Sequence, residues 1–137
     1  MLYIMRHGKT EWNQQHKLQG RTDIPLNDEG RKMAEAAHTE YLDVHFDVCY
    51  TSPLIRAKET AEILLEGRNI PLYEDQRIQE ISFGSYEGMS CVDKTKEENL
   101  AFQKFFQDTG NYIPPEDAES VEQLYERTGE FLKSLEE

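Results

Sequence analysis

Short apolar runs and stretches of helical spacing alternate along the first half of the chain, which predicts strands and helices in turn. Residues 2–5 form a continuous apolar run, the pattern of a strand that is buried on both faces. Residues 46–51 are rich in β-forming side chains, and residues 71–73 predict a third short strand. This order predicts an α/β fold with a mostly parallel sheet, in which ligands bind beyond the carboxyl ends of the strands.

The helical stretches carry their own start signals. Residues 28–42 repeat apolar side chains at helical spacing, and Asn27 is the expected N-cap. Residues 53–65 predict a second helix, because Ser52 is a good N-cap and Pro53 suits the first helical position. The apolar face of the first helix is expected to comprise Met33, Ala37 and Tyr41.

The second half of the chain is irregular until about residue 94. Three phenylalanines within residues 102–106 then indicate a helix that ends near Gly110. Ser120 and Gln123 form a capping box, which predicts a long amphipathic helix up to residue 135. No repeat or low-complexity tract is visible.

Length and charge narrow the class of protein. A chain of 137 residues favours one domain, so we expect residues 1–137 to form a single unit. The net charge of −12 argues against binding to nucleic acid or to an anionic membrane. Two cysteines, Cys49 and Cys91, are too few for a disulfide framework, and they form no zinc-type motif. The apolar run at residues 1–5 is too short for a targeting segment or a membrane-spanning helix. A cytoplasmic protein is the expectation.

Three segments place reactive groups at strand ends or helix starts. Arg6, His7 and Gly8 follow the first strand, where the imidazole has a fixed cation beside it and the glycine lets a ligand approach the backbone. Arg56 lies one turn into the second helix, whose free amides would complete an anion site. Glu80 precedes a glycine-rich and aromatic loop that could desolvate it for use as an acid. Taken singly, these residues can equally be a loop histidine, a helical ion pair and a surface carboxylate.

Together, these segments resemble the histidine phosphatase superfamily, the phosphoglycerate-mutase-like proteins, over essentially the whole chain. The resemblance comprises four ordered blocks, which is far more specific than a lone Arg-His-Gly. The matching residues are Arg6-His7-Gly8 with Thr10-Glu11-Trp12-Asn13; Gly20 with Asp23, Pro25, Leu26 and Gly30; Ser52-Pro53-Leu54 with Arg56-Ala57 and Thr60-Ala61; and Glu80 with Phe83-Gly84 and Glu87-Gly88.

The resemblance implies a role for each candidate. His7 is the nucleophile that takes the phosphoryl group, and Arg6 and Arg56 hold the phosphate oxygens. Glu80 is the proton donor to the leaving oxygen and later activates water, with no metal or cofactor. The further phosphate contacts implied are Asn13, Gln19 and Gly20. The expected partners are a small phosphorylated metabolite as substrate and inorganic phosphate as product.

The resemblance also implies a three-layer α/β/α sheet that is incomplete in this chain. In the family, a second catalytic histidine follows a later strand, and that strand lies between the first two strands of the sheet. The sequence ends at Glu137, before any such segment. We therefore expect a partial domain with unpaired strand edges that favour self-association, and weak activity.

The phosphatase branch fits better than the mutase branch. The mutases resemble one another in an arginine directly after the glutamate and a tyrosine two residues later, where this chain has Ile81 and Phe83. No arginine lies between Met89 and Pro115 to hold a second phosphate. The alternatives are a phosphoglycerate-mutase-type phosphotransferase and a non-catalytic fragment that binds phosphate or another protein.

Overall fold

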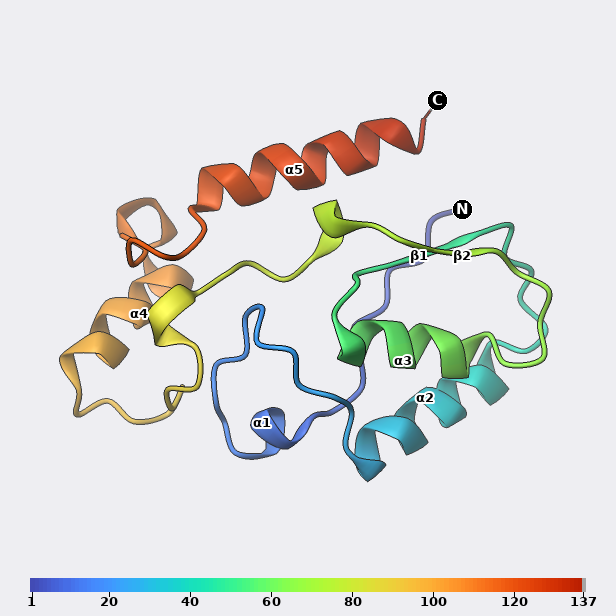
Figure 1. Cartoon of the computed structure of the whole chain (residues 1–137), viewed down its shortest axis with the longest axis horizontal. Coiled ribbons are helices and arrows are strands. Elements are labelled where there is room, and N and C mark those ends of the chain that lie inside the picture. Colours follow the sequence, from blue (N-terminus) through green and yellow to red (C-terminus); the bar gives the residue numbers. More distant parts are fainter. Residues whose placement is uncertain (137) are drawn as a thin grey trace. The chain divides into compact units, whose positions relative to one another are not determined.

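Two short parallel strands form the sheet of the computed structural model, which describes residues 1–136. Strand β1 (Cys49–Thr51) pairs with β2 (Leu72–Glu74), and Tyr50 lies opposite Tyr73. Helix α3 (Ile55–Leu64) connects the two strands and lies against them (Figure 1). This strand, helix and parallel strand confirm the predicted α/β class. Strand β1 is shorter than the predicted residues 46–51, and β2 is displaced by one residue from the predicted residues 71–73.

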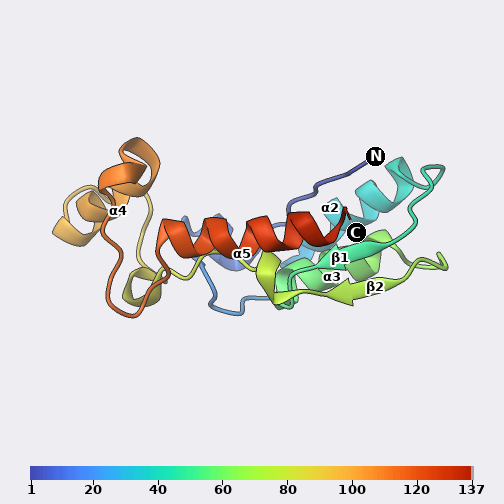
Figure 2. The same cartoon turned by 90° about the horizontal axis from the view of Figure 1, so that it is seen from above.

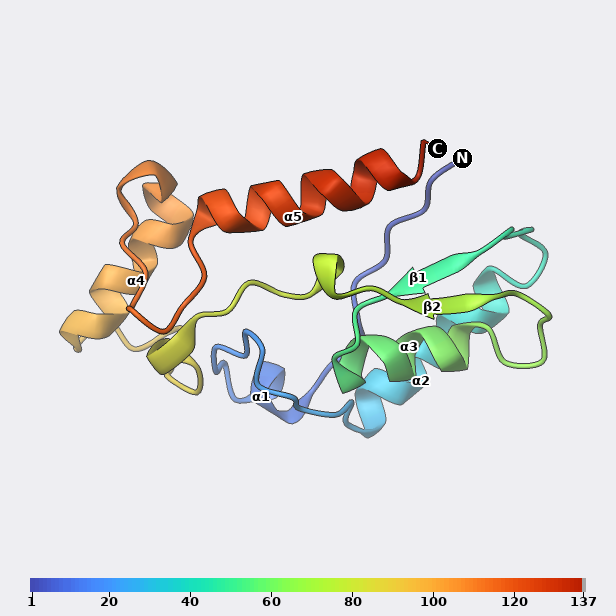
Figure 3. The ribbon, with the colours of Figure 1, turned by 45° about the horizontal axis from the view of Figure 1, so that its top comes forward.

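Helix α2 (Asp28–Glu40) packs on α3 in the same compact unit, which comprises Met1–Glu11 and Asp23–Gln76 (Figure 3). The predicted N-cap is confirmed, because the Asn27 side chain accepts a hydrogen bond from the Gly30 amide at 2.8 Å. The buried face differs from the predicted one. Gly30 and Ala34 are buried, whereas 47% of Met33 is exposed, because small residues let α2 approach its neighbours closely.

The predicted first strand is wrong in this structure. Residues 2–5 belong to no strand, and Leu2 and Ile4 are 62% and 88% exposed. A strand is stabilised by hydrogen bonds to a neighbouring strand, and no such ladder involves these residues within the described part of the chain. The ring of Tyr3 instead contacts Tyr41 and Phe46 edge-on.

The segment after residue 5 passes very close to the start of α2. A Cβ atom at Gly8 would overlap the Gly30 carbonyl, and a Cβ atom at Gly30 would overlap the Lys9 carbonyl. Lys9 in turn accepts a hydrogen bond from the Asn27 amide at 3.0 Å. Both glycines are therefore required by this approach, which holds the backbone next to His7 against α2.

A second compact unit comprises Trp12–Thr22 and Arg77–Glu137. Its core is a mainly aromatic cluster with Phe102 on helix α4 (Glu97–Gln107) at its centre. The other buried members are Leu18, Ile81, Phe83 and Tyr112. The Phe102 ring lies 5.2 Å from that of Phe83, and the two rings are nearly perpendicular. The predicted helix is confirmed, but it ends at Gln107 and not near Gly110, and a short 3₁₀ turn follows at Thr109–Asn111.

Helix α5 (Val121–Ser134) begins at the predicted capping box, in which Ser120 and Gln123 bond each other's backbone amides. Figure 2 shows α4 beyond the N-terminal end of α5. The predicted apolar face is buried only in part, because Phe131 is 9% exposed and Tyr125 is 74% exposed. The remaining short elements are α1 (Glu11–Gln14) and 3₁₀ turns at Gln76–Ile78 and Gly84–Tyr86. The prediction of a single domain is not tested by this division and stays a prediction.

Within residues 1–136, no helix is both long and apolar enough to cross a membrane.

Candidate active site

The imidazole of His7 is half-buried and bonds the backbone beside it. Its Nδ1 atom lies 2.6 Å from the carbonyl oxygen of Gly8. A carbonyl oxygen only accepts hydrogen bonds, so Nδ1 carries the hydrogen and the neutral ring has its lone pair on Nε2. This arrangement fixes which ring nitrogen can act as a nucleophile.

A chain of hydrogen bonds ties the His7 loop to α3. The Gly8 amide donates to the Thr60 hydroxyl at 3.0 Å, and that hydroxyl donates to the Arg56 carbonyl at 2.7 Å. Gly8 and Thr60 are buried, so both groups depend on these bonds. Thr60 thus links the backbone of the predicted nucleophile to the helical turn that carries Arg56.

Arg56 is among the most buried side chains of the first unit, with 2% of its surface exposed. An arginine is rarely buried unless its charge is paired or hydrogen-bonded, so its position is well defined. Arg6, by contrast, is exposed. Arg6, His7 and Arg56 therefore belong to one unit, but their side chains differ in burial. Arg56 is buried, His7 is half-buried and Arg6 is exposed.

The N-terminus of α3 differs from the prediction. The helix begins at Ile55 rather than Pro53, and Ser52 bonds the Leu54 amide at 3.2 Å. A carboxylate oxygen of Asp23 accepts from the Ile55 amide at 2.7 Å. The first amide of the helix thus donates to an acidic side chain. The sequence predicted free amides here that would bind an anion together with Arg56, and for the Ile55 amide this prediction is wrong.

Glu80 lies in the second unit, just after the 3₁₀ turn at Gln76–Ile78. Its side chain is exposed, so the structure does not bury this carboxylate as the sequence predicted. Its Oε1 atom accepts from the Ile81 amide at 3.0 Å. The next side chain of the loop is anchored, since Ile81 is 1% exposed and lies in the aromatic cluster. Glu80 is therefore an accessible carboxylate on a loop that is fixed on one side.

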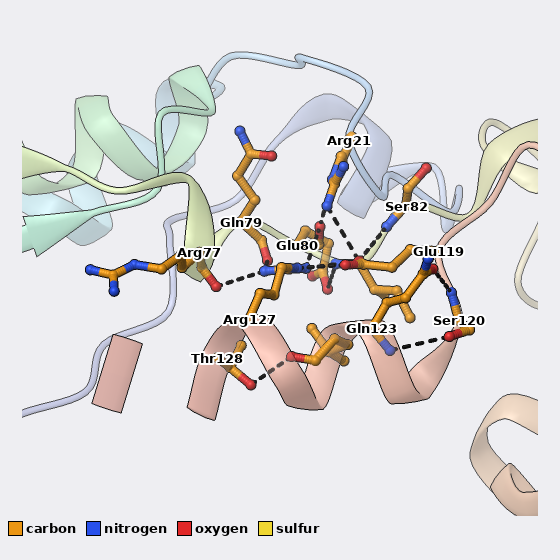
Figure 4. A network of polar contacts seen from close by, with 12 residues as sticks. Arg21, Arg77, Gln79, Glu80, Ser82, Glu119, Ser120, Gln123, Arg127 and Thr128 are labelled. Atoms are coloured by element: carbon orange, nitrogen blue, oxygen red, sulfur yellow. Dashed lines mark hydrogen bonds and ion pairs between the residues drawn. The ribbon is translucent and has the colours of Figure 1, made fainter. Parts of the chain in front are cut away.

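A network of ion pairs holds the backbone around Glu80 to α5 (Figure 4). The Glu119 carboxylate pairs with Arg127 at 2.5 Å and with Arg21 at 3.3 Å. Burial by itself raises the pKa of the Glu119 carboxyl, but the hydrogen bonds and charge of Arg127, with the charge of Arg21, outweigh it and hold this pKa below its usual range. Glu119 is therefore a fixed anion between two guanidinium groups.

A hollow of about 390 Å³ adjoins this network, and its lining includes Ser82, Asp117 and Gln123. None of these ion pairs was predicted from the sequence. The only local signal of the network is the capping box, because the arginine of α5 bonds residues about fifty positions earlier.

Glu87 organises the loop that contains Gln19 and Gly20. Its carboxylate accepts from the amides of Arg21, Thr22 and Phe83, at 3.1, 2.7 and 3.0 Å. Gly20 has a φ of +53°, and a Cβ atom there would overlap this carboxylate. Glu87 therefore ties the predicted phosphate-binding loop to the loop that follows Glu80.

Asn13 is half-buried in α1, and Gln19 is 8% exposed. Asn13, Gln19, Gly20 and Glu80 all belong to the second unit, whereas the predicted nucleophile and the two predicted phosphate-binding arginines belong to the first. Among residues 1–136, no three His, Cys, Asp or Glu side chains are grouped to hold a metal ion.

Comparisons with known proteins agree with the fold. The family model of the histidine phosphatase superfamily (branch 1) matches residues 2–137. The chain is 44% identical over 93 residues to the uncharacterized phosphatase PhoE of Bacillus subtilis. The matched region covers 68% of this chain and 48% of that protein. The chain is 30% identical to phosphoserine phosphatase 1 of Hydrogenobacter thermophilus, over 98% of this chain and 63% of that protein.

The structure is similar to that of YhfR from Bacillus stearothermophilus, with a TM-score of 0.86 and 36% identity. The match covers 95% of this chain and 64% of that one. The chain thus spans less than two thirds of the length of each of these three relatives.

Proposed function

The chain belongs to the histidine phosphatase superfamily, and we propose that it hydrolyses small phosphomonoesters through a phosphohistidine formed on His7. The observation that carries the proposal is the hydrogen bond from Nδ1 of His7 to the Gly8 carbonyl, because it leaves the lone pair on Nε2. A nucleophile of this kind needs a fixed orientation. The bond from the Gly8 amide to Thr60 supplies it.

In the first step, Nε2 of His7 attacks phosphorus as the ester bond from phosphorus to oxygen breaks. The electron pair of that bond goes to the leaving oxygen, which takes a proton from the Glu80 carboxyl. Negative charge on the phosphoryl oxygens is greatest while the group is transferred, so the arginines are most useful at that moment. Arg56 fits this role because its burial fixes the position of its charge.

In the second step, a water oxygen attacks phosphorus and gives a proton to the Glu80 carboxylate. The bond from phosphorus to nitrogen breaks, and its electron pair returns to the His7 ring. The products are inorganic phosphate and an enzyme ready for another cycle, so one hydrolysis is divided into two displacements. Arg6, Asn13, Gln19 and Gly20 are proposed as further phosphate contacts.

Transfer to water is favoured over transfer to a second hydroxyl by the packing after Glu80. Ile81 and Phe83 stand where the mutases resemble one another in having arginine and tyrosine, and both are buried, with 1% and 5% of their surface exposed. Apolar side chains inside the core offer no charge to a second phosphate. A phosphotransferase is therefore the weaker candidate.

The proposal extends to the setting of the reaction. The substrate is a small phosphorylated metabolite, the product is inorganic phosphate, and the proposed steps use no metal in a cytoplasmic protein. Self-association of this chain is also part of the proposal, and the exposed apolar side chains of residues 2–5 support it.

The test is to trap the phosphoenzyme in the full chain. A rapid quench with radiolabelled p-nitrophenyl phosphate is expected to leave label on the protein that is stable in alkali and lost in acid. His7→Ala is expected to abolish the label. His45→Ala is the matched control and should keep the label, because the His45 side chain is exposed and its Nε2 atom lies 3.2 Å from the carboxylate of Asp47.

Three outcomes would contradict the proposal. Label that persists in His7→Ala excludes His7 as the nucleophile. Phosphate that moves between hydroxyls without release of inorganic phosphate identifies a phosphotransferase. Vanadate binding without turnover of any phosphomonoester identifies a non-catalytic fragment.

A further inference from the structure

The guanidinium group of Arg127 contacts three backbone carbonyls in the segment that ends at Glu80 (Figure 4). Its Nη1 atom donates to the carbonyls of Arg77 and Gln79, each at 2.8 Å, and its Nη2 atom donates to that of Glu80 at 3.3 Å. The same group binds both oxygens of Glu119, at 2.5 and 2.8 Å. One side chain of α5 therefore serves five acceptors.

The carbonyl of Glu80 receives a second guanidinium. Nε of Arg21 donates to it at 3.2 Å, while Arg21 also pairs with Glu119. The carboxylate of Glu119 is only 9% exposed and lies within 3.4 Å of the Ser82 amide. The backbone on both sides of Glu80 is thus bonded to a single acidic group and its two arginines.

We infer that Arg127 is a positioning residue, which fixes the backbone of Glu80 so that its carboxyl can protonate the leaving group. This inference rests on the proposed function, in which Glu80 is the acid. Glu80 is exposed and lies on a loop, so packing around its own side chain does not fix it. Loops are otherwise the more mobile parts of a fold, and a displacement of about 1 Å can cost about a hundredfold in rate.

An arginine is suited to this task and a lysine is not. The guanidinium is a planar fork with five N–H groups, whereas an ammonium is a point charge with three. Arg127 is itself well placed, since its side chain is 15% exposed and α5 begins at a complete capping box. Arg127 therefore holds the loop around Glu80 to helix α5, which is itself well ordered by its cap.

The experiment compares two leaving groups in the full chain. The p-nitrophenolate ion leaves without a proton, whereas the alkoxide of glycerol 2-phosphate needs one. Loss of a well-placed acid therefore slows the alkyl ester far more than the aryl ester. General acid catalysis contributes about 10²- to 10⁴-fold.

We expect Arg127→Met to lower kcat/KM for glycerol 2-phosphate by about 10- to 100-fold, and kcat/KM for p-nitrophenyl phosphate by less than about threefold, because part of that acid contribution is lost. The ratio kcat/KM reports the transfer to His7 and not the later hydrolysis step that both esters share. Arg127→Lys should recover only part of the loss. Lys133→Met is the matched control, because it removes an exposed charge from the same helix and should leave both rates unchanged.

An equal fall of kcat/KM for both esters in Arg127→Met would overturn the inference, since a structural role slows the transfer step of all substrates alike. Full activity of this variant on the alkyl ester would overturn it as well. If the unchanged chain turns over neither ester, the proposed function fails and the catalytic part of the inference fails with it.

A second measurement separates that failure from a failure of the contact itself. Amide hydrogen exchange of residues 77–82 should become faster in Arg127→Met than in Lys133→Met. Equal exchange in the two variants would refute the positioning role, whatever the activity.

Discussion

Replacing Thr60 with valine removes the hydroxyl that links the His7 loop to α3. Valine has almost the shape of threonine, so the substitution leaves no cavity, and what it changes is hydrogen bonding. The Gly8 amide, which donates to Thr60 at 3.0 Å in a buried environment, loses its acceptor. We expect Thr60→Val to destabilise the first unit and to loosen the backbone next to His7.

The magnitude follows from the two bonds of this hydroxyl. A buried amide without an acceptor costs about 1–3 kcal/mol. The bond from the hydroxyl to the Arg56 carbonyl adds little, because that carbonyl also accepts the regular helical bond. The expected loss is therefore about 2 kcal/mol, which corresponds to a shift of about 1 M in the urea midpoint for a slope near 2 kcal/mol/M.

Thr39→Val is the matched control. The Thr39 hydroxyl also donates to the carbonyl four residues earlier, at 3.2 Å, but on the exposed surface of α2. The two variants lose the same kind of helical bond, so their difference isolates the bond from the Gly8 amide. Thr60→Ser retains the hydroxyl and should recover most of the stability.

Urea unfolding followed by circular dichroism, together with amide exchange at Gly8, measures the effect. Thr60→Val should lower the midpoint and accelerate exchange at Gly8, and the same variant should form less phosphoenzyme. Equal midpoints for Thr60→Val and Thr39→Val would refute the reasoning, because they would show that the Gly8 amide does not depend on this hydroxyl.

Two further predictions concern the second unit. Glu119→Gln should lower stability at neutral pH, and its difference from the unchanged chain should shrink as pH falls below about 4.3, the usual pKa of glutamate. A carboxyl whose pKa is depressed by folding stabilises the folded state above the unfolded pKa and loses that contribution in acid, so urea midpoints that differ by the same amount from pH 7 to pH 3 would contradict this account. Phe102→Ala should cost about 3–5 kcal/mol, because the ring is 2% exposed within the aromatic cluster, whereas Phe106→Ala should cost much less because that ring is 71% exposed; similar unfolding midpoints for the two variants would contradict this.

Local signals predicted the elements whose causes lie within a few residues. The N-cap at Asn27 and the capping box at Ser120 are confirmed because each needs only neighbours in the sequence. The order of strands and helices was likewise predictable, since it depends on short apolar runs and on helical spacing. The family and its fold were recognisable from four blocks of residues, each read as a local pattern, and the family match confirms them.

Predictions failed where an element depends on a partner far along the chain. The apolar run at residues 2–5 has the composition of a strand, but a strand exists only where another strand supplies its hydrogen bonds. The start of α3 moved because Asp23, which precedes it by more than thirty residues, binds the Ile55 amide. In both places, long-range contacts decided between local alternatives.

The sequence by itself determined which side chains could carry the chemistry, because an imidazole, a guanidinium and a carboxyl have their reactivity wherever they stand. Only the tertiary structure decided how they are held. It assigns the lone pair of His7 to Nε2 through the Gly8 carbonyl, and it fixes the backbone of Glu80 through Arg127. Such bonds join residues through backbone atoms, which are alike in every residue, so a pattern of side chains along the sequence does not predict them.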